Sequence, residues 1–124
     1  MPWTVILVQE VDDWFNALVR QDPESADLVA AAIDLLAETG PTLGRPLVDR
    51  IEGSSLHNMK ELRPGSQGRS EVRMLFIFDP ERQAVLLVAG DKQGRWSQWY
   101  ENSIPEAERR YKRWLDGGYA EEIR

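Results

Sequence analysis

The stretch SEVRMLFIFDPERQAVLLVAG, residues 70–90, decides the fold. Residues 70–78 place Val72, Met74, Phe76 and Phe78 on one face of a strand and Arg73, Leu75 and Ile77 on the other, which is the alternation of a β-strand. Asp79-Pro80-Glu81 is typical of a turn, and residues 84–89 form an unbroken apolar run that predicts a second, buried strand. The stretch therefore predicts an antiparallel β-hairpin at the centre of a sheet.

Further strands are expected on the N-terminal side of this hairpin. The pattern of residues 57–63 predicts a strand, and residues 64–68 predict the turn that follows it. The loop of residues 41–56 has room for a short strand at residues 47–51. At the start of the chain, the β-branched apolar run 3–8 predicts a buried strand. Residues 57–63 and the two strands of the hairpin together predict an antiparallel meander.

Two helices are expected between the first strand and this meander. Val11, Trp14, Phe15 and Leu18 have the i, i+3, i+4, i+7 spacing of an amphipathic helix. Asp22-Pro23-Glu24 is typical of a helix start, with Asp22 as N-cap, and Gly40-Pro41 of a helix end. Because the link between the two helices is very short, they should form an antiparallel hairpin packed on the sheet.

The last helix is expected to begin at a capping box. Residues 90–102 are polar and aromatic without a regular period, whereas Ser103-Ile-Pro-Glu106 matches the capping-box pattern, and Gly117-Gly118 would end the helix. The predicted order is β-α-α-β-β-β-α, with one further short strand in the 41–56 loop. The fold class is α+β, with an antiparallel meander sheet, an N-terminal helical hairpin and a C-terminal helix.

Composition narrows the class of protein. The chain has 124 residues, 42% of them hydrophobic, with no cysteine and one histidine. It is expected to form one domain over residues 1–124, without a disulfide framework, a cysteine nucleophile or a structural zinc site. No apolar run is long enough for a membrane span and no leader pattern is visible, so a cytoplasmic protein is expected.

The charge is acidic overall but unevenly distributed. Lys and Arg total 15 against 21 Asp and Glu, a net charge of −6. This argues against non-specific nucleic-acid binding by the whole surface, because phosphate attracts positive charge. Basic residues nevertheless gather from Lys60 to Arg113, whereas residues 9–38 contain one basic residue, Arg20, among many acids. A local basic site therefore remains open.

Three short motifs carry a family resemblance: MKELR at residues 59–63, VRMLF at 72–76, and VAGDK at 88–92 followed by the helix from Ile104. In this order and spacing the chain resembles the RelE/ParE superfamily of bacterial toxins over about residues 3 to 115. The sharper resemblance is to the phage-derived HigB-like branch.

The resemblance implies a toxin of a type II toxin–antitoxin system that inhibits translation by cutting mRNA on the ribosome, without metal or cofactor. The ribose 2′-hydroxyl would attack the neighbouring phosphate, which requires a base, cations for the phosphate charge and an acid for the leaving oxygen. The implied partners are the ribosome, mRNA and a cognate antitoxin, a helix-turn-helix protein from the adjacent gene. No membrane is involved.

The resemblance also implies site residues. Arg73 matches the strand arginine that holds the scissile phosphate, Lys60 and Arg63 match the basic strand before it, and Lys92 matches the basic loop after the last strand. Tyr100 lies near the position where RelE-like members place a catalytic aromatic residue.

The residues themselves leave alternatives open for these and neighbouring positions. A hairpin turn at 64–68 would set Lys60 and Arg73 nearly opposite on one face as a phosphate clamp, unless Glu61 or Glu71 pairs with them in a surface network. His57 can serve as a general acid or base or be an ordinary polar residue at a strand end. Candidate RNA-binding residues, besides Arg63, are Arg95 and Trp96. The aromatic residues of this segment, Trp99 and Tyr100 included, can stack on bases or pack the last helix, and packing is favoured for Trp99.

Two other functions remain open from the sequence. A ParE-like relative would poison DNA gyrase without the cleaving residues. A non-catalytic module of the same fold would only bind the antitoxin, which the acidic composition and the tryptophan-rich segment 92–100 favour. The basic residues Lys60, Arg63 and Arg73 favour the nuclease.

Overall fold

The fold is built on one five-stranded sheet. The computed structural model describes residues 2–65, 71–94 and 96–119. Its strands are β1 (Thr4–Leu7), β2 (Val48–Arg50), β3 (Lys60–Leu62), β4 (Val72–Phe78) and β5 (Gln83–Asp91), in the spatial order β1-β5-β4-β3-β2. The short strand expected within residues 47–51 is present as β2.

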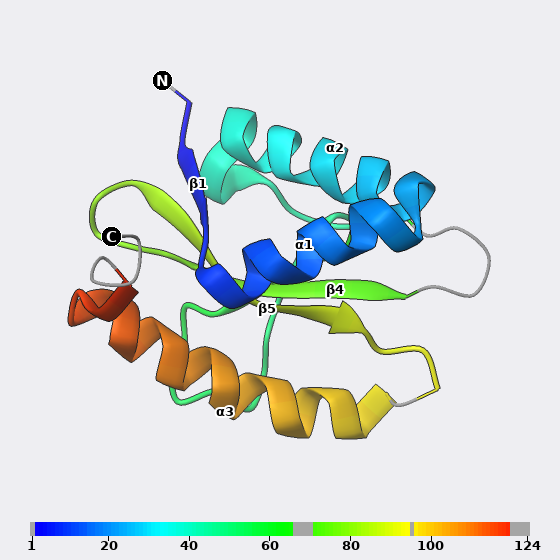
Figure 1. Cartoon of the computed structure of the whole chain (residues 1–124). Coiled ribbons are helices and arrows are strands. Elements are labelled where there is room, and N and C mark those ends of the chain that lie inside the picture. The colour runs from blue at the N-terminus through cyan, green and yellow to red at the C-terminus, as the bar shows by residue number, and fades with distance from the viewer. Residues whose placement is uncertain (1, 66–70, 95, 120–124) are drawn as a thin grey trace.

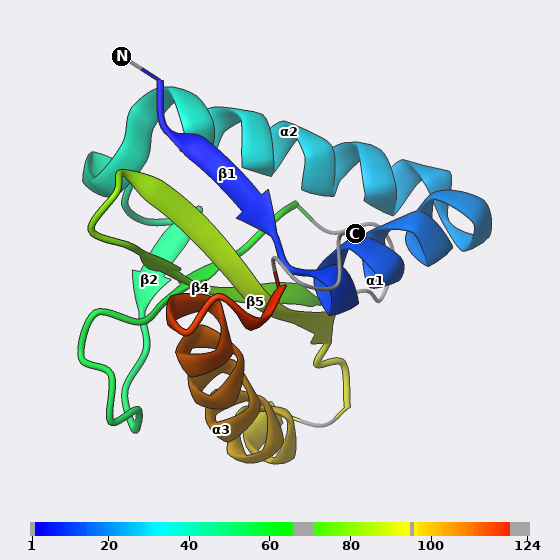
Figure 2. The same ribbon diagram turned by 60° about the vertical axis from the view of Figure 1, so that its left-hand side comes forward.

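Strands β2 to β5 form the predicted antiparallel meander. Leu62 pairs with Met74 across β3 and β4, and Ile77 pairs with Val85 across β4 and β5. The first strand was predicted without a partner, and the structure shows it parallel to β5, with Val5 opposite Ala84. Figure 2 shows β1 along the β5 edge of the sheet.

Helices cover both faces of the sheet. Figure 1 shows the hairpin of α1 (Gln9–Gln21) and α2 (Pro23–Thr39) on one side and α3 (Trp96–Leu115) on the other. This arrangement explains why β4 and β5 are apolar on both faces, since each face is removed from water by a helix. The α+β class is confirmed.

The hairpin turns where the sequence predicts. Asp22 caps α2: its carboxylate accepts hydrogen bonds from the Ser25 backbone N–H at 3.3 Å and the Ser25 hydroxyl at 2.6 Å. The other end of α2 stops at Gly40, whose φ of +71° is unfavourable for a residue with a side chain. The indole of Trp3 lies where a Cβ of residue 40 would be, so the glycine is required there for packing as well as for the backbone turn.

The start of the last helix was predicted wrongly. The capping-box pattern placed it at Ser103, whereas α3 begins at Trp96 and contains Pro105. Trp99, Ile104 and Ala107 are all buried, so one continuous helical face packs against the sheet across the proline. Tertiary packing outweighs the local start signal, because burial of these side chains stabilises the extra turns.

A β-bulge in β5 explains the structural role of Arg110, a basic residue of α3. Leu75 pairs with Val88 but Phe76 pairs with Leu86, which leaves Leu87 as the extra residue. Arg110 Nη1 donates a hydrogen bond to the Leu87 carbonyl at 2.8 Å. Buried carbonyl groups need a partner, and α3 supplies one here.

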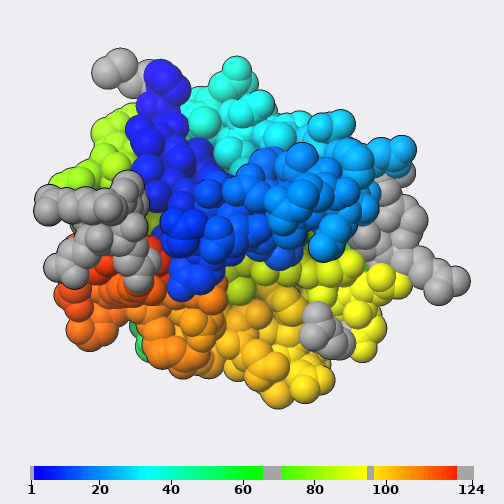
Figure 3. Space-filling model, in the orientation of Figure 1, coloured from blue at the N-terminus to red at the C-terminus, as the bar shows by residue number. Residues whose placement is uncertain are grey.

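Ion pairs tie the same stretch of α3 to α1. Arg110 Nε and Arg113 Nη1 each lie 3.5 Å from Glu10 Oε2. The first turn of α1 and the later part of α3 adjoin in the space-filling view (Figure 3). These two arginines therefore belong to the contact between the two helices.

Among the residues that the structure describes, no helix combines the length and apolar character needed to cross a bilayer.

Candidate functional site

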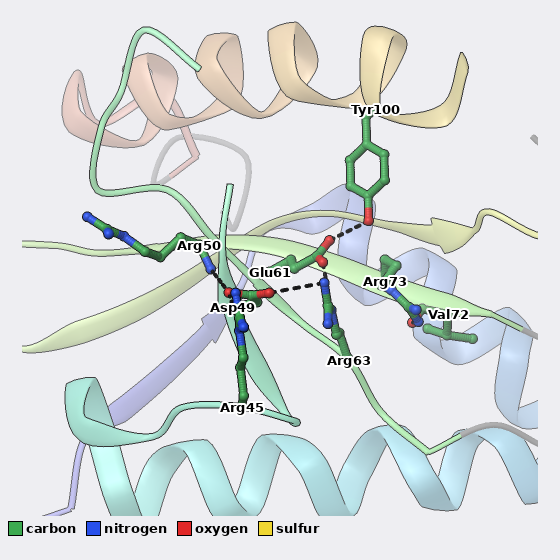
Figure 4. Close-up of polar contacts among 8 residues, drawn as sticks. All are labelled: Arg45, Asp49, Arg50, Glu61, Arg63, Val72, Arg73 and Tyr100. Atoms are coloured by element: carbon green, nitrogen blue, oxygen red, sulfur yellow. Dashed lines mark hydrogen bonds and ion pairs between the residues drawn. The ribbon is translucent and has the colours of Figure 1, made fainter. Parts of the chain in front are cut away.

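A buried carboxylate lies at the centre of the candidate site. Glu61 of β3 is only 2% exposed and points towards α3. Its Oε2 accepts a 2.6 Å hydrogen bond from the Tyr100 hydroxyl, and its Oε1 accepts a 2.7 Å bond from Arg63 Nε (Figure 4). One acidic residue thus joins a basic residue of the sheet to an aromatic residue of the helix.

A second carboxylate shares the same arginine. Asp49 of β2 is the cross-strand neighbour of Glu61, a placement that is unfavourable for two like charges. Arg63 relieves the repulsion, because its Nη2 lies 3.3 Å from Asp49 Oδ2 while its Nε contacts Glu61. Arg63 therefore acts mainly as the counter-ion of these two carboxylates. A network of this kind was the alternative considered for Lys60 and Arg73, and the structure shows it at Arg63 instead.

Arg45 adds a further cation at this edge. Its Nε lies 3.1 Å from Asp49 Oδ1, and its side chain is 78% exposed. A backbone hydrogen bond from Arg50 and the side chain of Arg45 lower the pKa of Asp49 below its ordinary value, and the charge of Arg63 acts in the same direction. Asp49 is accordingly a firmly ionised group.

Arg73 differs from Arg63 in its surroundings. It lies on β4 opposite Gly90, on the same sheet face as Glu61. Its Nη1 donates to the Val72 carbonyl at 2.9 Å, its buried Nε has no hydrogen-bond partner, and within the described residues it forms no ion pair. A half-buried guanidinium with unused donors is a suitable ligand for an anion.

Lys92 lies beside this arginine. It directly follows β5, is 3% exposed, and its Nζ is 5.6 Å from the centre of the Tyr100 ring. Burial lowers the pKa of Lys92, the positive charge of Arg73 lowers it further, and Glu71 and Glu61 oppose the shift. An ammonium group under these conditions gives up its proton more readily than an exposed lysine.

Tyr100 stays protonated in this environment. Burial raises its pKa to about 12, and the hydrogen bond to Glu61 contributes in the same direction. At neutral pH the phenol is therefore a hydrogen-bond donor to Glu61, and its ring faces the ammonium of Lys92.

Part of the site opens to solvent through a hollow of about 460 Å³ beside β2 and β3. It is lined by Arg45, Asp49, Arg50, Ile51, Glu52, Glu61, Arg63 and Tyr100. Tyr100 and the cations Arg45, Arg50 and Arg63 thus line a hollow that is open to solvent.

The expected pairing of Lys60 with Arg73 is wrong. The β3–β4 register places Lys60 opposite Phe76, and successive residues of a strand point to opposite faces, so Lys60 lies on the face away from Glu61 and Arg73. Its Nζ is 5.5 Å from the ring centre of Phe78 and 3.5 Å from the Pro41 carbonyl. The error arose from the loop length, because the connection between β3 and β4 is longer than the turn assumed.

His57 also lies apart from the cluster. It is exposed in the loop between β2 and β3, where it lines a different hollow of about 410 Å³ together with Lys60 and Phe78. Arg95 lies outside the described residues, as does the side chain of Trp96. Trp99 is buried against Gly90, so its predicted packing role is confirmed.

The structure brings together four of the predicted residues, Arg63, Arg73, Lys92 and Tyr100, and adds three that sequence reasoning did not select. These are Glu61, Asp49 and Arg45. The signal for Glu61 was available, since it lies two residues before Arg63 and therefore on the same strand face. Asp49 and Arg45 gave no comparable signal, because they reach the site only through the β2–β3 pairing.

Comparison with models of known protein families assigns the chain to one family. The family model of the phage-derived Gp49-like proteins (DUF891) matches residues 13–112. The chain belongs to this Gp49-like family, and its curated relatives carry the name HigB.

Individual relatives agree with this placement. The chain is 53% identical over 111 residues to the candidate toxin HigB3 of Mycobacterium tuberculosis, covering 90% of this chain and 92% of that protein. It is 58% identical over 106 residues to the candidate toxin HigB2 of the same organism, covering 86% of this chain and 51% of that protein. The chain thus spans about half the length of HigB2 and most of HigB3.

A solved structure has the same fold. A doubly substituted variant of the Escherichia coli toxin RelE in the free state superposes with a TM-score of 0.60 at 11% sequence identity, covering 85% of this chain and 97% of that one.

Proposed function

We propose that this protein is the toxin of a type II toxin–antitoxin system and an endoribonuclease that inhibits translation by cutting mRNA on the ribosome. The names of the relatives HigB2 and HigB3 support a toxin. The observation that best supports nuclease activity is the position of Arg73, a guanidinium with unused donors beside Lys92 and Tyr100.

The roles follow from the geometry. Arg73 binds the scissile phosphate and stabilises the negative charge that grows on it during attack by the 2′-hydroxyl. Lys92, whose pKa is lowered by burial and by Arg73, donates the proton that the leaving 5′-oxygen needs. The products are a 2′,3′-cyclic phosphate and a 5′-hydroxyl end, and no metal takes part in these steps.

The acidic balance of the chain is consistent with this local site. Arg63 is occupied by Glu61 and Asp49, so Arg73 and Lys92 supply the positive charge that meets the phosphate beside Tyr100. The proposed partner in the cell is an antitoxin encoded by the adjacent gene, with the helix-turn-helix character implied by the family resemblance.

Expression of the chain alone tests the proposal. Wild-type protein should arrest bacterial growth and produce cuts in translated mRNA, mapped by primer extension. Arg73→Ala should lower the cleavage rate by about 10²–10³-fold, as expected for loss of a preorganised donor to the reacting group. The matched control is Lys112→Ala, because Lys112 is exposed on α3 and its ammonium lies 3.0 Å from Asp116 Oδ2, just beyond the end of that helix.

Two results would contradict this function. Intact transcripts with damaged gyrase–DNA complexes would indicate the ParE-like alternative. Normal growth with intact transcripts, together with a tight complex with the neighbouring gene's product, would indicate a non-catalytic binding module.

A further inference from the structure

The proposed reaction requires a group that removes the 2′-hydroxyl proton. Groups near Arg73 and Lys92 that can accept a proton include the carboxylates Glu61, Asp49, Glu71 and Asp91 and the phenol of Tyr100. Asp49 is held by Arg45, Arg63 and a backbone N–H, and its lowered pKa makes it a weak base. Tyr100 is protonated and already donates to Glu61. Neither can act as the base alone. Asp91 Oδ1 accepts the backbone N–H groups of Glu71 and Gln93, and the charge of Glu71 acts on Lys92, the group assigned to the leaving oxygen.

Glu61 cannot meet the substrate directly either. It is 2% exposed, and both carboxylate oxygens accept hydrogen bonds, one from Arg63 and one from Tyr100. Tyr100 is only half buried, lines the hollow, and bonds to Glu61 through its hydroxyl at 2.6 Å. A proton arriving at the Tyr100 oxygen therefore has a short, aligned route to the carboxylate.

We infer that Glu61 is the terminal proton acceptor of the cleavage reaction and that Tyr100 is the catalytic residue that relays the proton to it. This rests on the proposed nuclease function. The 2′-O–H bond breaks as its proton passes to the Tyr100 oxygen, and the phenol's own proton passes to Glu61 Oε2. The 2′-oxygen bonds to phosphorus, the bond from phosphorus to the 5′-oxygen breaks, and that oxygen takes its proton from Lys92.

The relay accounts for the arrangement of charges. A tyrosine whose pKa is raised to about 12 is a poor base by itself, but a concerted transfer never forms a free tyrosinate. Arg63 holds the opposite oxygen of Glu61, which orients the carboxylate and keeps Oε2 directed at the phenol. The charged groups that face Glu61 are then Arg63 directly after β3, Asp49 from β2, Arg73 from β4 and Lys92 after β5.

The test is single-turnover cleavage of a synthetic mRNA on programmed ribosomes, using the full chain over a range of pH. Glu61→Gln and Tyr100→Phe should each lower the rate by about 10²–10⁴-fold, the range of general base catalysis, with mRNA affinity unchanged. The double variant should be no slower than either single variant, because both substitutions remove the same proton-transfer step. The wild-type rate should fall at acid pH, and this fall should be absent in both variants.

A substrate with sulfur in place of the 5′-bridging oxygen separates base from acid. A thiolate leaves without being protonated, so this substrate should restore the rate of Lys92→Met but not that of Glu61→Gln or Tyr100→Phe. Restoration of Glu61→Gln by this substrate would overturn the relay.

Each outcome has one meaning. If wild-type protein cuts mRNA and Glu61→Gln cuts it equally fast, the inference fails and the proposed function stands. If Glu61→Gln loses affinity while keeping the wild-type pH profile, Glu61 only positions Arg63 and Tyr100, and the inference also fails. If Glu61→Gln does not fold, Tyr100→Phe provides the test: loss of the fall in rate at acid pH supports the relay, and a wild-type pH profile contradicts it. If wild-type protein cuts no mRNA, the proposed function itself fails.

Discussion

Gly90 of β5 lies directly beneath the indole of Trp99, and a Cβ at position 90 would stand 2.8 Å from the indole nitrogen. Trp99 precedes Tyr100 on α3, so this contact sets the distance between the first turns of α3 and the sheet. The distance between Tyr100 and Glu61 depends on it.

Gly90→Ala should therefore destabilise the protein and displace the start of α3. Overpacking of this kind costs about 1–3 kcal/mol of unfolding free energy, measurable by chemical denaturation. Cleavage of mRNA should fall as well, because Tyr100 moves with Trp99. The control is Gly44→Ala, where a Cβ meets no atom within 4 Å. Equal stability of the two variants would contradict this account of α3.

Lys60→Ala should leave mRNA cleavage at the wild-type rate. Lys60 lies on the sheet face opposite Arg73, near Phe78 and Pro41. The comparison is Arg73→Ala, measured in the same growth-arrest and primer-extension assays. A loss for Lys60→Ala as large as that for Arg73→Ala would show that the RNA reaches both faces of the sheet, contrary to the site described above.

The Glu108 carboxylate should make the stability depend on pH. It accepts hydrogen bonds from the Ser54 hydroxyl at 2.7 Å and from the Ser55 hydroxyl at 2.8 Å, which hold the β2–β3 loop against α3 and lower the pKa of Glu108 below its ordinary value of 4.5. A lowered pKa means that the stabilisation is complete above about pH 4.5 and is lost as the pH falls through the folded-state pKa.

Glu108→Gln should accordingly unfold at lower denaturant concentration than wild type at pH 7, and the difference should shrink under acid conditions. Glu101→Gln, an exposed position on the same helix, is the matched control. A difference that stays constant with pH would exclude the ionised carboxylate as the cause.

The Tyr100 phenol should lose its proton only at a pH well above that of an exposed tyrosine. Its pKa is raised to about 12 by burial and by Glu61, and Tyr119 has a similar value, so the ultraviolet titration is best performed in a Tyr119→Phe background. In that background Glu61→Gln should lower the pKa of Tyr100, since the carboxylate's hydrogen bond and charge are removed, while burial still holds it above 10. An unchanged titration would indicate that the Tyr100–Glu61 bond is not maintained in solution.

Much of the fold was predictable from local patterns. The alternation in residues 70–78, the capping residue Asp22 and the turn at Gly40 each specify one element through its own neighbours, and the structure contains all three. The start of α3 was not predictable in this way, because buried contacts made by Trp99 outweigh the capping signal at Ser103.

The candidate site was predicted less completely. Arg73 stood out because a charged residue in an apolar strand requires a partner or a ligand, and Lys92 and Tyr100 followed from the resemblance. Lys60 was misplaced because the strand register, which depends on the loop between β3 and β4, decides which residues share a face.

The amino-acid sequence by itself determined the order of the elements, the family and the basic residues to which we assign the function, since each of these is expressed within a few neighbouring positions. Only the tertiary structure decided that Glu61 joins Arg63 to Tyr100, that Asp49 shares the same arginine and that Arg73 stays without an ion pair among the described residues. The physical reason is that these contacts link strands and a helix distant along the chain, and one residue of register reverses the face on which every side chain lies.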